Sequence, residues 1–203
     1  MPQYNTIADN AAIDRTKVAL EANGFAVTIA EDADEATKSV LAMLPKGAEV
    51  FTVTSQTLSQ IGLDAAINDS GDYDAVRPKL FALMNQPEKK LEQRKLGAAP
   101  EYVVGSVHAL TQDGHALVAS ATGSQLPAYT FGAAHVIWVV GAQKIVKDDA
   151  QAEERLRTHV FPLENERSKQ AYSAPSEIRK LVHFYKELPG RIHVVIVKQT
   201  LGF

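Results

Sequence analysis

The stretch Gly105–Val146 constrains the fold of this chain more than any other part of it. An apolar segment, residues 115–120, leads into a loop of glycine and small hydroxyl-bearing residues, Thr122–Gln125. A short helix follows with Pro127 in its first turn, where the missing N–H of proline costs nothing. A fully apolar strand, Val136–Val140, comes next. Such a strand–loop–helix–strand unit is typical of adjacent parallel strands whose carboxyl ends share one edge of a sheet.

This edge is where the sequence predicts a ligand. Lys144 lies just beyond the apolar strand, so we expect it beside the loop, at the edge where open α/β sheets bind ligands. Backbone N–H groups at a helix start, hydroxyl groups, and a glycine that permits close approach together make an anion site. The candidate ligand-binding residues are Thr122, Gly123, Ser124, Gln125 and Lys144. The alternative is an ordinary capped turn and an exposed lysine, which need the same residue types.

The rest of the chain alternates helical and strand patterns. Helices are expected over residues 7–22 and 33–44, and strands over residues 25–29 and 50–54. This alternation favours an α/β fold with three α/β/α layers and a mainly parallel sheet, in a single domain over residues 1–203. The turn signal Asp113-Gly114 predicts a hairpin between residues 103–111 and 115–120. A second, antiparallel hairpin is expected at the C-terminal end, between residues 181–185 and 192–197.

Composition excludes several classes of function. A net charge of −3 gives no field that would attract nucleic acid or an anionic membrane surface. The 203 residues include no cysteine, so this chain offers no thiolate ligand for an iron–sulfur cluster and no thiol nucleophile. We see neither a secretion signal in the first residues, Met1–Thr6, nor a membrane-spanning run, and therefore expect a cytoplasmic protein.

Two further groups of residues could carry chemistry. Glu164, Glu166 and Arg167 follow Pro162; one carboxylate could act as a base or nucleophile while the arginine holds an anion. The simpler interpretation is an ion pair between Glu164 and Arg167 on one helix face.

Ser106 and His108 stand two residues apart, so on a strand they share a face and could both contact a ligand. His108 and His115 have no accompanying carboxylate cluster, which argues against a metal site.

Several motifs resemble the LUD (lactate-utilisation) domain family, which includes the LutC-type proteins. The segments that carry this resemblance are Gly105–Thr111, Ser120–Gln125, Val136–Val146, Pro162–Arg167 and Leu201–Phe203. The resemblance implies a fold similar to that of sugar-phosphate isomerases, CoA transferases and methenyltetrahydrofolate synthetase, whose ligands carry phosphate or carboxylate groups. It also implies a part in oxidising L-lactate to pyruvate, in an assembly whose other subunits hold iron–sulfur clusters.

Three hypotheses follow from the residues and the resemblance together. In the first, the chain is a cluster-free subunit or accessory protein of lactate utilisation that binds a small anionic ligand. In the second, it is an independent enzyme acting on a small phosphorylated or acyl (CoA-type) substrate. In the third, it is a non-catalytic interaction subunit. A homo-oligomer is compatible with each hypothesis.

Overall fold

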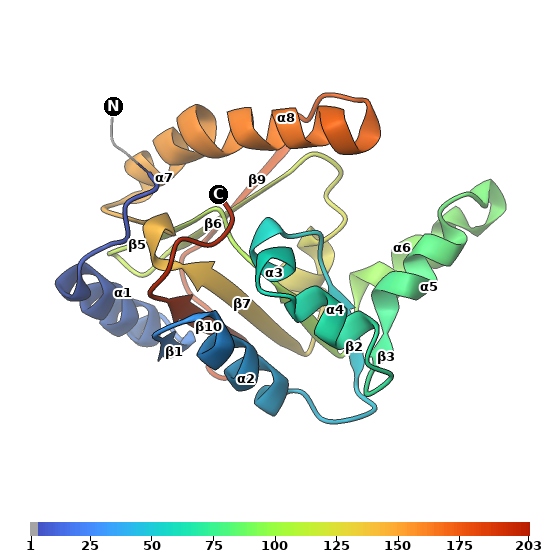
Figure 1. Ribbon diagram of the computed structural model, residues 1–203, viewed down its shortest axis with the longest axis horizontal. Coiled ribbons are helices and arrows are strands. Elements are labelled where there is room, and N and C mark those ends of the chain that lie inside the picture. The colour runs from blue at the N-terminus through green and yellow to red at the C-terminus, as the bar shows by residue number, and fades with distance from the viewer. Residues whose placement is uncertain (1–3) are drawn as a thin grey trace.

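A mainly parallel sheet forms the centre of the molecule (Figure 1). The computed structural model describes residues 4–203; Met1–Gln3, on which the expectation about a secretion signal partly depends, lie outside this range. Six strands pair in parallel in the order β1-β10-β7-β4-β2-β3. They span Ala26–Ala30 (β1), Ile192–Val197 (β10), His135–Gly141 (β7), Tyr102–Gly105 (β4), Glu49–Thr52 (β2) and Asp74–Ala75 (β3). The predicted α/β class with a mainly parallel sheet is confirmed.

The inner strands are apolar because both of their faces are covered. On β7, Val136, Trp138 and Val140 pack into the core on one face, whereas Ile137 and Val139 pack into the core on the other. All five are buried. An uninterrupted apolar run is what a strand buried on both faces requires.

Helices cover both faces of this sheet. On one face, α2 (Ala33–Met43), α3 (Gln56–Gln60) and α4 (Leu63–Asn68) contribute Val40, Leu58 and Leu63 to the core. On the other, α1 (Asn10–Ala22) packs beside a second sheet. The remaining helical segments are α5 (Val76–Leu83), η1 (Pro87–Lys89), α6 (Lys90–Ala98), η2 (Ala128–Gly132) and η3 (Ala142–Lys144).

The second sheet has the order β8-β5-β6-β9, and it corrects two of the expectations. Its strands are Ile145–Val146 (β8), Ala109–Thr111 (β5), Ala116–Ser120 (β6) and Lys180–Phe184 (β9). The tight turn at Asp113-Gly114 does join two antiparallel strands, β5 and β6. The predicted first arm, however, is divided at Gly105 between β4 of the main sheet and β5 of the second. β6 belongs to the second sheet and β7 to the main sheet, so the two strands are not neighbours. The expected strand–loop–helix–strand unit with adjacent parallel strands is therefore wrong.

The predicted C-terminal hairpin is also wrong. Both strands exist, but β9 pairs antiparallel with β6 in the second sheet, and β10 lies parallel between β1 and β7 in the main one. The residues explain the difference. β10 is almost wholly buried and apolar, which suits the middle of a covered parallel sheet, whereas most of β9 is only half-buried.

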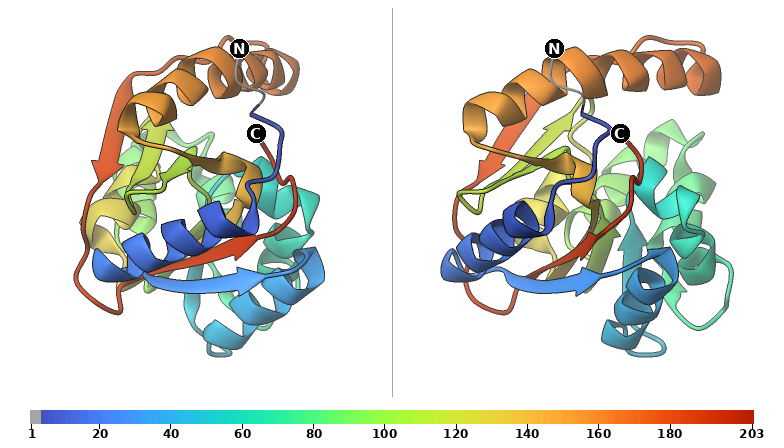
Figure 2. Two further views of the ribbon diagram at one scale, coloured as in Figure 1. Left: turned by 90° about the vertical axis from the view of Figure 1, so that its left-hand side faces the viewer. Right: turned by 60° about the vertical axis from the view of Figure 1, so that its left-hand side comes forward.

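A long helical rod passes over the second sheet (Figures 1 and 2). It consists of α7 (Asp149–Arg155), a π-helical turn η4 (Leu156–Val160) and α8 (Phe161–Tyr172). Proline in a helix interior normally breaks or kinks the helix, but this one continues through Pro162. In the wider turn, the Phe161 N–H bonds the Leu156 carbonyl five residues back. We attribute the continuity to this widening, which makes room where a proline ring would otherwise crowd the preceding turn.

Within residues 4–203, none of the helices combines the length and the apolar character that crossing a membrane requires.

Candidate functional site

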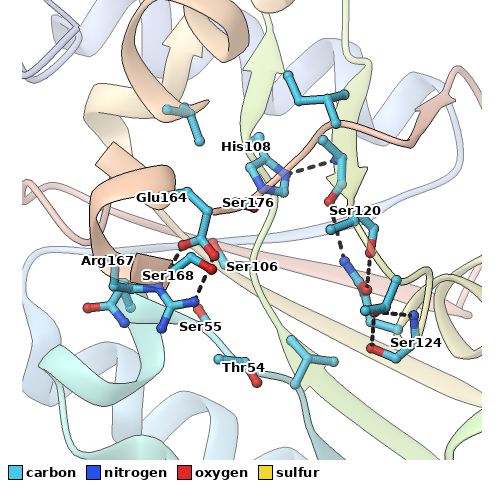
Figure 3. A pocket seen from close by; sticks show the side chains of 18 of the residues that line it. Thr54, Ser55, Ser106, His108, Ser120, Ser124, Glu164, Arg167, Ser168 and Ser176 are labelled. Carbon is cyan, nitrogen blue, oxygen red and sulfur yellow. Dashed lines mark hydrogen bonds and ion pairs between the residues drawn. The ribbon is translucent and has the colours of Figure 1, made fainter. Parts of the chain in front are cut away.

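A cavity of about 620 Å³ lies where the two sheets and the helical rod meet (Figure 3). Its walls come from the segment that follows β2, the link between β4 and β5, the loop after β6, and α8 with the residues that follow it. Hydroxyl-bearing side chains recur around it, as Ser55, Ser106, Ser120, Ser124 and Ser168 show in the close view. The cavity is therefore polar on several sides.

Eight of the ten residues proposed from sequence line this cavity. They are Ser106, His108, Thr122, Ser124, Gln125, Lys144, Glu164 and Arg167. Gly123 and Glu166 are not among the lining residues. Glu166 lies on an exposed part of α8 and pairs with Lys169. The structure thus brings the loop after β6 and the Glu164–Arg167 pair to one place, which the sequence alone could not show.

Two backbone N–H groups of the loop after β6 are already bonded within the loop. The Gly123 N–H donates to Ser120 Oγ at 2.8 Å, and the Ser124 N–H donates to Thr122 Oγ1 at 3.3 Å. Ser120 in turn donates to Gln125 Oε1 at 2.9 Å. The side chains of Thr122 and Ser124, both exposed, line the cavity and offer hydroxyl groups to a ligand.

Lys144 is buried in the wall of the cavity, with 3% of its surface exposed. Its ammonium group donates to Thr57 Oγ1 at 2.9 Å, Ser106 Oγ at 3.2 Å and the Val107 carbonyl at 3.4 Å. These oxygens are all uncharged. Burial, helped by the nearby charge of Arg155, lowers the pKa of Lys144 to about 7. The lysine can therefore exist as either an ammonium ion or a neutral amine near neutral pH.

Lys144 also lies against the C-terminal segment. The neighbouring Gln143 accepts the Leu201 N–H at 3.3 Å and donates to the Leu201 carbonyl at 2.8 Å. Gly202 lies so close to Thr57 and the Lys144 amine that a Cβ there would meet both side chains. The terminal motif and the lysine thus form one part of the site.

His108 is held as a neutral ring. Its Nδ1 accepts the Ala119 N–H at 3.1 Å, which leaves the proton of the neutral ring on Nε2. Burial, with the charges of Lys144 and Arg155, lowers the pKa of His108 to about 3. The nearby Ser106 hydroxyl bonds Lys144 instead of this ring.

Arg167 and Glu164 form the ion pair that their spacing predicted. Two hydrogen bonds of 2.7 Å join the guanidinium to the two carboxylate oxygens. The hydrogen bonds that Arg167 donates to this carboxylate raise the pKa of Arg167 above its ordinary value. Arg167 also lies over the Tyr172 ring at 5.4 Å. Both partners line the cavity, so a ligand would meet a pre-formed pair.

Sequence analysis missed Arg77 and Arg155. Arg77, on α5, lines the cavity, where it donates to the Thr52 carbonyl and to Thr54 Oγ1, both at 3.0 Å. Arg155 is fully buried, and its Nη1 donates to the His108 carbonyl at 2.5 Å. The only local signal for Arg77 was its place beside Pro78 in the first turn of a helix, which is weak. Arg155 had none.

The charges around the cavity favour an anion. Its basic lining residues are Arg77, Lys144, Arg167 and Arg179, and its acidic ones are Glu164 and Glu177. The two acids are already paired, with Arg167 and Arg179. Within residues 4–203, no carboxylate forms an ion pair with Arg77 or Lys144, and no group of three or more potential metal-ligating side chains occurs.

Comparisons with known proteins agree with this architecture. The crystal structure of a DUF162 family protein from Deinococcus radiodurans superposes with a TM-score of 0.59 at 12% sequence identity, covering 95% of this chain and 99% of that one. At this identity, the similarity shows a shared fold. No curated protein matches the sequence. The LUD domain family matches residues 13–197, nearly the whole chain, and the protein therefore belongs to the LUD domain family.

Proposed function

We propose that this protein binds a small anionic metabolite in the cavity and, through it, takes part in L-lactate utilisation. The observation that carries the proposal is a basic cavity in which Arg77 and Lys144 lack carboxylate partners within the described residues. A carboxylate or phosphate group would supply the missing negative charge. Charge-assisted hydrogen bonds of this kind contribute about 1.5–3 kcal/mol each.

The hydroxyl groups support the same proposal. Thr122 and Ser124 from the loop after β6, and Ser106 beside Lys144, can bond further oxygen atoms of the ligand. Glu164 is the candidate base, but its bond to Arg167 engages both of its oxygens. Proton abstraction by Glu164 would therefore require a ligand anion to take over the Arg167 guanidinium.

Lactate utilisation involves a redox step, and this chain contains no cysteine to ligate an iron–sulfur cluster. We therefore propose that it acts as the cluster-free component, with iron–sulfur proteins as partners. Growth tests this role. A strain that lacks the gene should regain growth on L-lactate when it receives the wild-type gene, and not when it receives the Lys144→Gln variant.

The volume of the cavity favours a second candidate. Ligand cavities of roughly 300–1,000 Å³ suit molecules of drug-like size, whereas lactate and pyruvate have only about six heavy atoms each. At about 620 Å³, this cavity has space for a phosphorylated or acyl compound. An independent enzyme acting on such a substrate is therefore the alternative function.

Calorimetry against a panel of anions would decide between these candidates. The panel would contain lactate, pyruvate, inorganic phosphate, sugar phosphates and CoA esters. We expect Arg77→Gln and Ser124→Ala to weaken binding of the recognised anion, the former by about tenfold or more. Lys147→Gln, which removes a charge from an exposed site three residues beyond Lys144, is the matched control and should bind normally. Unchanged affinity in both cavity variants would contradict the proposed site. If none of the anions in the panel binds, the hypothesis of a non-catalytic interaction subunit is favoured.

A further inference from the structure

Lys144 differs from a lysine whose only role is an ion pair. Its amine is buried, and its hydrogen-bond partners are two hydroxyl oxygens and one carbonyl oxygen. A buried ammonium normally requires a carboxylate to offset its loss of hydration. Within residues 4–203 Lys144 has no such partner, although it lines the wall of a large cavity.

The hydrogen-bonding arrangement suits a neutral amine as well as an ammonium ion. The Thr57 and Ser106 hydroxyl groups can rotate, so that each can accept from an ammonium or donate to the lone pair of an amine. The charged or titratable neighbours that act on Lys144 are Arg155 and His108, and neither brings negative charge. Burial together with Arg155 lowers the pKa of Lys144 to about 7, so a substantial fraction of the amine is unprotonated at neutral pH.

An amine of this kind is a nucleophile toward carbonyl groups. We propose that Lys144 forms a covalent imine with the carbonyl carbon of a ligand that also carries a carboxylate or phosphate group. This proposal rests on the anion-binding function above and adds the reactive group that the ligand must possess. Arg77 and the hydroxyl groups of Thr122 and Ser124 would bind the negative group.

The reaction balances without an oxidant or a reductant. The lone pair of the neutral amine forms a C–N bond to the carbonyl carbon, and the π electrons of the C=O bond move to the oxygen. A proton passes from nitrogen to this oxygen to give a carbinolamine. The oxygen takes up a second proton from solvent and leaves as water while the nitrogen lone pair forms the C=N bond. The resulting iminium then releases its N–H proton to solvent and becomes the imine. The water released accounts for the carbonyl oxygen and two hydrogen atoms.

Reductive trapping tests the proposal directly. The purified protein would be incubated at pH 7 with pyruvate, or separately with glyceraldehyde 3-phosphate, in the presence of sodium cyanoborohydride, which reduces an imine to a stable secondary amine. Peptide mass spectrometry would locate the adduct; with pyruvate, the modified lysine gains the mass of pyruvic acid less one oxygen atom. The two arms distinguish a carboxylate-bearing ligand from a phosphate-bearing one.

We expect Lys144 to be modified at least about tenfold faster than exposed lysines, because an ordinary lysine at pH 7 is almost entirely protonated. The preference should disappear in urea-unfolded protein. Lys144→Arg should lose the adduct, whereas Lys147→Arg, the exposed matched control, should keep it. If Lys144→Arg does not fold, the wild-type protein alone is sufficient for the test. The extent of modification at each lysine would then be compared between the folded and the urea-unfolded protein.

The outcomes separate this proposal from the proposed function. Modification of Lys144 by either probe in preference to the exposed lysines supports the imine. If calorimetry shows that pyruvate or the phosphorylated aldehyde binds, but neither leaves an adduct at Lys144, the imine proposal is overturned and the anion site stands. If neither probe binds or reacts, the imine proposal is overturned as well, and the remaining anions of the calorimetric panel decide the proposed function. Equal modification of all lysines also overturns the imine.

Discussion

At the scale of single residues, Lys144 links the stability of the fold to pH. Its pKa is about 7 in the folded protein and 10.5 in its ordinary state, so between these values the unfolded chain binds more protons. The free energy of unfolding should therefore rise with pH across this range, by up to about 1.4 kcal/mol per pH unit from this residue. Lys144→Met, which has no titrating group, should remove this contribution. Urea unfolding of the wild type and of Lys144→Met at pH 7, 8 and 9 would measure how the free energy of unfolding depends on pH in each protein. Equal dependence on pH in the two proteins would refute the prediction.

His108 should act similarly in the acid range. Its pKa falls from 6.5 to about 3 on folding, so the unfolded chain binds more protons between these values. Stability due to this residue should thus decline as the pH falls from 6.5 toward 3, by at most about 1.4 kcal/mol per pH unit. His108→Asn offers an amide oxygen to the Ala119 N–H but does not titrate. Thermal unfolding at pH 6.5 and pH 4.5 should show a smaller loss in this variant than in the wild type; an equal loss would count against the assignment.

Residue types near predicted strand ends identified several of the residues that line the cavity. Small hydroxyl residues after an apolar strand pointed to Thr122 and Ser124, and a lysine after another pointed to Lys144. Arg77 and Arg155 could not be found in this way. Arg77 faces the cavity, and the buried Arg155 contacts the His108 carbonyl behind its wall. Both positions result from tertiary packing, which nothing in the local sequence of a helix records.

At the scale of elements, Gly105 marks the point where the chain leaves the main sheet for the second. A Cβ at this position would overlap the Tyr129 hydroxyl and Val53. Gly105→Ala should therefore destabilise the protein by about 1–3 kcal/mol through overpacking. Gly97→Ala is the matched control: in α6 its Cβ would make only ordinary contacts, 3.7 Å and more from Leu80, and should stabilise the helix by up to about 1 kcal/mol. Denaturant unfolding would measure the change in the free energy of unfolding for each variant. Changes of the same sign in the two variants would be inconsistent with this packing.

Helix starts were predictable from sequence because their signals are local. Asp32 and Asp148 cap α2 and α7 by accepting the N–H groups of Glu35 and Gln151, both at 2.9 Å. An Asp followed three residues later by Glu or Gln is a local signal of a helix start. Strand partners were not predictable in the same way. The run Ile192–Val197 identified a strand, but its place between β1 and β7 depends on segments more than 50 residues distant in the sequence. Strand pairing was therefore where prediction failed, in the expected C-terminal hairpin and in the expected parallel pairing of β6 with β7.

At the scale of the whole molecule, the cavity joins parts that are otherwise separate. Its walls come from the main sheet and α3, from the second sheet, and from the rod that contains α8. Glu164 and Ser124 line different sides of the same cavity because these parts of the fold converge there (Figure 3). No pattern within either segment specifies it. The fold class, by contrast, follows from alternating local patterns and could be predicted.

Because the cavity has walls from three parts of the fold, a bound anion should protect all of them together. With whichever anion of the calorimetric panel binds, hydrogen exchange should slow in peptides covering residues 54–57, residues 106–108 and α8. A ligand that binds only the folded state stabilises it by about 2.7 kcal/mol at a hundredfold excess over its dissociation constant. α2 contributes no residue to the cavity, so its exchange should change least. Mass spectrometry with and without the anion would test this pattern. Protection limited to one wall, or strongest in α2, would show that the anion binds elsewhere.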